Sequence, residues 1–112
     1  MELTNRHCVP CEGGVPKLGA AAVQDLLAQV TGWVLGDGRI AKRLKFRDFA
    51  HLMAYVNRLA DLAELEGHHP DFAVHYNILD VSVWTHAVNG LTENDFILAA
   101  KIDAMGGGHA LS

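Results

Sequence analysis

The segment from Asp48 to Pro70 constrains the fold more than any other part of the sequence. Its apolar residues recur at the spacing of one helix face: Phe49, Leu52, Met53, Val56, Leu59, Ala60 and Ala63. Asp48 is a residue type that caps helix N-termini, and Gly67 and Pro70 are typical of helix ends. The pattern predicts a helix over residues 48–66 that buries one face against the rest of the molecule.

The sequence before this helix predicts a shorter helix and a β-hairpin. Apolar residues recur at helical spacing between Leu18 and Gly32, which predicts an amphipathic helix. The runs 33–35 and 39–46 then read as strands on either side of Gly36-Asp37-Gly38. An Asp-Gly pair between two such runs is a strong signal for a tight hairpin turn.

The sequence after the long helix predicts two strands and a last helix. The strands are expected over 72–77 and 79–85, and strict alternation in the second places His86 on its mixed, partly polar face. Thr92 and Asp95 have the spacing of a capping box, so a helix should start there and run to about Met105. Apolar residues occupy more than one face of this helix, which indicates burial on two sides or an oligomer contact. The order of elements predicts an α+β fold, an antiparallel sheet covered by helices.

The length and the net charge of the chain exclude several classes of protein to which it could belong. With 112 residues the chain is expected to be one domain over residues 18–108, preceded by a flexible arm over residues 1–17. The formal net charge of −4 argues against nucleic-acid binding. The apolar runs are too short to span a bilayer, and the N-terminus does not resemble a secretory signal. We therefore expect a cytoplasmic protein with neither membrane nor nucleic-acid partners, and its small size favours a homo-oligomer.

Three of the seven histidines stand where acid–base chemistry could use them. His68 and His69 follow the long helix, whose terminal carbonyls favour a protonated imidazole, and His86 could converge with them on one cleft. Histidines also occur at helix ends for capping alone, which is the structural alternative. A third possibility is a zinc site formed by the same three histidines. Adjacent histidines on an extended segment tend to point in opposite directions, so we expect no metal.

Taken together, the spacing of these residues resembles the signature of the pterin-4a-carbinolamine dehydratases. The anchors are Glu64, the His68-His69-Pro70 run, Tyr76, His86 and Asp95, separated by three, five, nine and eight residues. Similarity continues in Phe46-Arg47-Asp48-Phe49 and in Gly90-Leu91-Thr92, and it covers about Trp33 to Ile102.

The resemblance implies a fold and an activity. The fold would be a four-stranded antiparallel sheet with three helices on one face, in the order α-β-β-α-β-β-α, assembled into dimers or tetramers. The reaction would dehydrate 4a-hydroxytetrahydrobiopterin (a pterin-4a-carbinolamine) to quinonoid dihydropterin and water. It would use no cofactor or metal and would recycle the pterin of aromatic amino-acid hydroxylases, to which a functional link is expected.

The resemblance also implies roles for individual residues. His68 and His86 match the proton-transferring histidines, and His69 matches the substrate-binding histidine. Asp95 matches the acidic catalytic position, where it would orient His86 or polarise the site. Glu64 matches the first signature position and would support substrate binding.

Two other interpretations remain open. Some relatives serve as a dimerisation cofactor of a homeodomain transcription factor, and others resemble assembly factors, so a non-catalytic binding protein of the same fold is the alternative. The complete set of histidines favours the enzyme. Cys8-Val9-Pro10-Cys11 could be redox-active or half of a zinc site, but no thioredoxin-like helix follows it. Its role stays unassigned, and both cysteines are expected to be free thiols.

Overall fold

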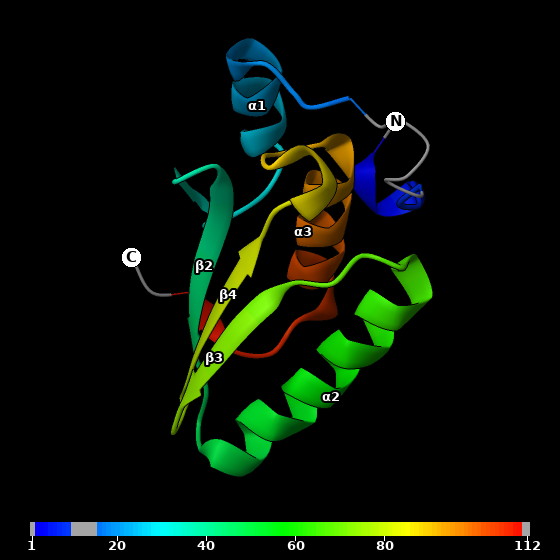
Figure 1. Cartoon of the computed structure of the whole chain (residues 1–112). Coiled ribbons are helices and arrows are strands. Elements are labelled where there is room, and N and C mark those ends of the chain that lie inside the picture. Colours follow the sequence, from blue (N-terminus) through cyan, green and yellow to red (C-terminus); the bar gives the residue numbers. More distant parts are fainter. Residues whose placement is uncertain (1, 10–15, 111–112) are drawn as a thin grey trace.

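The computed structural model describes residues 2–9 and 16–110, and it has the predicted α+β architecture (Figure 1). The main elements follow the predicted order: α1 (Ala20–Leu27), β1 (Val34–Gly36), β2 (Arg39–Lys45), α2 (Phe49–Glu66), β3 (Asp71–His75), β4 (Ile78–Val83) and α3 (Glu93–Met105). Three short elements were not predicted: the 3-10 helices η1 (Leu3–Asn5) and η3 (His86–Val88), and strand β5 (His109–Ala110). Within the described ranges, no helix is both long and apolar enough to cross a membrane.

The four main strands form an antiparallel sheet in the order β1-β2-β4-β3. The short strand β5 adds to β2 opposite Leu44 and Lys45. Gly106, Gly107 and Gly108 return the chain from α3 to that position, and all three have a positive φ. A Cβ on Gly108 would lie 2.8 Å from the ring of Phe46, so this approach requires glycine. The fold therefore continues past residue 108, where the sequence had predicted its end.

The ends of α2 confirm the predicted helix. The Asp48 side chain caps its N-terminus by accepting a hydrogen bond from the His51 backbone N–H at 2.9 Å. Gly67 ends the helix in the left-handed conformation, with a φ of 65°. The first helix is shorter than expected, because α1 ends at Leu27 and the chain continues in turns.

The core lies between the sheet and the helices, which cover one face of the sheet (Figure 1). The sheet contributes a row of buried side chains: Ile40, Leu44, Leu79, Val81 and Val83. Every residue of α3 from Asn94 to Ala100 is buried, because the helix lies between the sheet on one side and η1 on the other. Burial on two sides therefore explains the apolar residues around this helix.

Residues 2–9, which belong to the segment predicted to be a flexible arm, contact the folded domain in this structure. Leu3 in η1 is part of the core, and the backbone of Cys8 and Val9 is hydrogen-bonded to side chains of α2 and α3. The sequence pattern missed this because the segment has no periodicity, and polar contacts to distant residues hold it in place.

Candidate functional site

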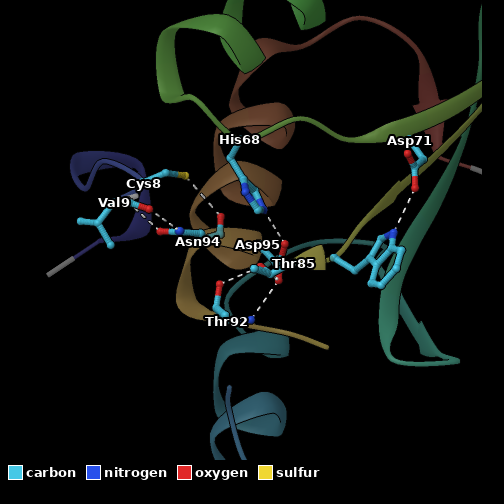
Figure 2. A network of polar contacts seen from close by, with 9 residues as sticks. Cys8, Val9, His68, Asp71, Thr85, Thr92, Asn94 and Asp95 are labelled. Atoms are coloured by element: carbon cyan, nitrogen blue, oxygen red, sulfur yellow. Dashed lines mark hydrogen bonds and ion pairs between the residues drawn. The ribbon is translucent and has the colours of Figure 1, made fainter. Parts of the chain in front are cut away.

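A buried pair formed by His68 and Asp95 is at the centre of the candidate site (Figure 2). Nε2 of His68 lies 2.6 Å from Oδ1 of Asp95, and the Asp95 carboxylate is fully shielded from solvent. The turn at Gly67 directs the chain back, so that the backbone N–H of His68 donates to the Ala63 carbonyl at 3.2 Å. The end of α2 thus holds the imidazole against the first turn of α3.

The second carboxylate oxygen of Asp95 closes the N-terminus of α3. Oδ2 accepts hydrogen bonds from the Thr92 backbone N–H at 2.9 Å and from Thr85 Oγ1 at 2.8 Å. The hydroxyls of Thr85 and Thr92 lie 2.9 Å apart. Asp95 is therefore both the capping-box residue that the sequence predicted and the partner of a histidine, with one oxygen for each task.

Thr85 is a site residue that our sequence reasoning missed. It falls on the apolar side of the alternation that runs through Leu79, Val81 and Val83, and it is buried. A hydroxyl on the buried side of a strand needs a hydrogen-bond partner, and that requirement was the signal available in the sequence.

His69 faces away from the buried pair. Its Nε2 lies 3.0 Å from Oε2 of Glu64, and both side chains are exposed on the surface of the molecule. The two adjacent histidines therefore have opposite environments, as expected for an extended segment before Pro70. Among the described residues, no group of three His, Cys, Asp or Glu side chains is placed to hold a metal ion.

The alternation predicts His86 on the face of a strand, but in the structure His86 lies beyond the end of that strand. Strand β4 ends at Val83, because Thr85 and Gly90 pair with each other and close the loop that contains η3. The exposed His86 ring lies over the Trp84 indole, with 3.9 Å between the ring centroids. The sequence predicts that Asp95 orients His86 or polarises the site; in the structure Asp95 contacts His68, and Trp84 contacts the His86 ring.

Trp84 is itself held by two neighbours that the sequence did not indicate. Its Nε1–H donates to Oδ2 of Asp71 at 3.0 Å, and the Arg39 guanidinium lies 4.9 Å from the ring centroid. Asp71 also borders a hollow of about 480 Å³, which extends over the open face of the sheet past Ser82. The hollow therefore begins at Asp71, which binds the Trp84 side chain under His86, and not at the His68–Asp95 pair.

Cys8 is a half-buried thiol with a raised pKa. Burial raises its pKa from 9.0 to about 12, and the nearby Glu66 carboxylate adds to the rise. A raised pKa lowers the fraction of thiolate, which is the form that reacts with oxidants and binds metals. Cys11, the other half of the motif, lies outside the described residues.

We expect the Cys8 thiol of the Cys11→Ser variant to react slowly with iodoacetamide. Because the pKa rises by about three units, the thiolate fraction near neutral pH should fall roughly a thousandfold below that of an exposed thiol. Mass spectrometry of the alkylated protein, compared with the same protein in urea, measures the ratio of rates. Equal rates in the folded and unfolded protein would contradict the raised pKa of this half-buried thiol.

The chain is similar to known proteins of one family. Residues 16–105 match the family described as Pterin 4 alpha carbinolamine dehydratase. A protein of Halorhodospira halophila named "Putative pterin-4-alpha-carbinolamine dehydratase" is 47% identical over 108 residues, covering 95% of this chain and 99% of the relative. A protein of the same name from Nitrosomonas eutropha is 47% identical over 105 residues, covering 93% of each chain.

Two solved structures share the fold. A transcriptional coactivator/pterin dehydratase from Brucella melitensis has a TM-score of 0.77 at 34% identity, covering 82% of this chain and 100% of that one. A pterin dehydratase-like protein identified as a RuBisCO assembly factor in the alpha-carboxysome has a TM-score of 0.55 at 26% identity. It covers 69% of this chain and 89% of its own.

Proposed function

This chain belongs to the Pterin 4 alpha carbinolamine dehydratase family, and we propose that it dehydrates 4a-hydroxytetrahydrobiopterin to quinonoid dihydropterin and water. The observation that carries the proposal is the buried His68–Asp95 pair, which joins two anchors of the family signature across 2.6 Å. A carboxylate that accepts a hydrogen bond from an imidazole stabilises the protonated form of that imidazole, and a general acid must be protonated before it reacts.

The reaction needs two proton transfers. The hydroxyl on C4a must leave as water, which requires a proton, and the adjacent ring nitrogen must lose one. In our proposal His86 and His68 transfer these protons. When His68 donates through Nε2 to Asp95, Nδ1 is the ring atom that can exchange a proton with the substrate. His86 is exposed, so it can reach a bound pterin directly.

Substrate binding is assigned to the exposed pair. His69 and Glu64 lie on the surface beside the end of α2, where their polar atoms can bind the polar edge of a pterin. We propose His69 as the direct ligand and Glu64 as its support, because the carboxylate fixes one nitrogen of the imidazole.

The proposal also covers the oligomeric state of the protein, its location in the cell and its partners. Val34 and Phe72, apolar side chains on the outer strands β1 and β3, are exposed in the single chain, and a homodimer or homotetramer would bury such surface. We further propose that the protein acts in the cytoplasm, without cofactor or metal, and that an aromatic amino-acid hydroxylase supplies its substrate. The mild negative charge supports the absence of a nucleic-acid partner.

The direct test is the dehydration of freshly generated 4a-hydroxytetrahydropterin, followed by ultraviolet absorbance. The wild type should accelerate the reaction, and His68→Ala and His86→Ala should each lower the rate by roughly a hundred- to ten-thousandfold. Circular dichroism should show that both variants remain folded. His75→Ala is the matched control, because His75 is an exposed histidine paired with Asp80 on the open face of the sheet.

Two results would count against this function. Wild-type turnover in both histidine variants would remove the proposed acid–base roles. A wild type without activity would favour a binding role, such as those named for the two solved relatives, and partner capture from cell extract would then be the next experiment.

A further inference from the structure

A short N-terminal strap, residues His7–Val9, connects the two elements that supply His68 and Asp95. On the α2 side, the Cys8 backbone N–H donates to Oε1 of Glu66 at 2.8 Å, and His7 Nδ1 lies 3.0 Å from Oε2. On the α3 side, the Val9 backbone donates to Oδ1 of Asn94 at 3.0 Å and accepts from its Nδ2 at 2.7 Å. Figure 2 shows Cys8 and Val9 of the strap beside Asn94, together with His68 and Asp95.

The two strap contacts are next to the site in sequence as well as in space. Glu66 is separated from His68 only by Gly67, and Asn94 directly precedes Asp95. The strap therefore connects the end of α2 to the start of α3 at the place where the His68–Asp95 hydrogen bond also connects them. A change in the distance between these helix ends would alter the orientation of the imidazole.

The side chains that bind the strap are buried, so breaking their hydrogen bonds is energetically costly. The side chains of Glu66 and Asn94 are almost completely shielded from solvent. Lys101 of α3 donates to the same Glu66 carboxylate at 2.7 Å, so the acid is joined to α3 on one side and to the strap on the other. Buried polar groups that lose their partners are costly, and the chain therefore keeps the strap in one place.

We propose that the strap positions His68 against Asp95 for proton transfer, with Asn94 as the positioning residue. The catalytic consequence rests on the function proposed above. The Cys8 thiol adds one long contact, to the Asn94 backbone carbonyl at 3.5 Å, whereas the shorter hydrogen bonds to Glu66 and Asn94 come from the backbone of the strap. A loosened strap would leave the reacting groups in place but less well aligned, and a small misalignment is enough to slow a proton transfer.

The test compares Asn94→Ala with two controls. Cys8→Ala keeps the backbone hydrogen bonds of the strap, and Asp48→Ala destabilises α2 at its opposite end, far from His68. The first measurement is the nuclear magnetic resonance spectrum of the His68 ring in ¹⁵N-labelled protein without ligand, assigned by comparison with His68→Ala. The second is the rate of dehydration over a range of substrate concentrations.

We expect Asn94→Ala to shift or broaden the His68 ring signals and to lower kcat roughly ten- to hundredfold, with a smaller change in KM. Both controls should keep the wild-type ring signals. If Asn94→Ala moves those signals no more than Asp48→Ala does, the strap does not position His68. If Asn94→Ala fails to fold, Asn94→Asp replaces it, because it keeps the shape but loses the donor to the Val9 carbonyl.

The two measurements separate the two proposals. The ring signals of the ligand-free protein test the strap, and wild-type turnover tests the dehydratase function. An inactive wild type with strap-dependent His68 signals would overturn only the function, whereas an active wild type with unchanged signals in Asn94→Ala would overturn only the positioning role.

Discussion

The Asp95→Asn variant is expected to remain folded and to lose dehydratase activity by roughly a hundred- to ten-thousandfold. The amide oxygen can still accept the hydrogen bonds from Thr92 and Thr85, so the cap of α3 is kept. The amide nitrogen then takes the position that faces His68 Nε2. Because this nitrogen donates, the imidazole must accept through Nε2, and its other nitrogen carries the proton.

This change affects catalysis more than stability for two reasons. The imidazole adopts the opposite tautomer, so Nδ1 can no longer accept a proton from the substrate. The negative charge that stabilises an imidazolium is also lost, and in a buried position that charge acts with little screening by solvent. Dehydration kinetics and thermal unfolding of the same preparation would measure both effects.

Asp80→Asn is the matched control for this prediction. Asp80 is also an acid beside a histidine, His75, at 3.5 Å, but it lies on the open face of the sheet and away from the site. Its replacement should leave turnover close to that of the wild type. Normal activity in Asp95→Asn would show that the buried carboxylate is only a helix cap, which is the structural interpretation of its place in the sequence.

The contrast between these two roles of Asp95 shows what the sequence could predict. The cap depends on residues three apart, so the spacing from Thr92 was sufficient to predict it. The contact with His68 spans 27 residues and depends on how α2 and α3 meet, which no local pattern encodes. The family resemblance placed both residues at one site, but it did not indicate which histidine the acid would contact.

The same reasoning explains why the surroundings of His86 and of the N-terminal segment differ from what the sequence pattern predicts. The period-two alternation continues through Thr85 and His86, but the pairing of Thr85 with Gly90 ends the strand and starts a tight loop. That pairing is set by tertiary structure. The strap lies in the segment that the sequence predicts to be a flexible arm, because that segment has no apolar period, whereas in the structure Glu66 and Asn94 form polar contacts with it.

The largest effect on stability is expected from Glu66→Gln. Burial acts to raise the Glu66 pKa, but hydrogen bonds from Lys101, the Cys8 backbone and His7 outweigh it and lower the pKa from 4.5 to about 2. A difference of that size corresponds to about 3 kcal/mol of folding free energy, which the charged form contributes at neutral pH. Glutamine is a neutral substitute, so the variant should be less stable than the wild type by about that amount at pH 7.

The pH dependence gives this prediction its sign. Because the folded-state pKa is depressed, the contribution is complete above pH 4.5 and is lost as the pH falls through about 2. Urea unfolding of the wild type and of Glu66→Gln should therefore show a difference in the free energy of unfolding that is constant from pH 7 to about 5. This difference should decrease to near zero towards pH 2. Glu64→Gln is the control on the same helix, where solvent surrounds the side chain and the difference should be small throughout. If the difference in free energy of unfolding between the wild type and Glu66→Gln persisted unchanged at pH 2, the variant would have lost stability through packing. The charge of Glu66, which Lys101 and the strap contact, would then not be the cause.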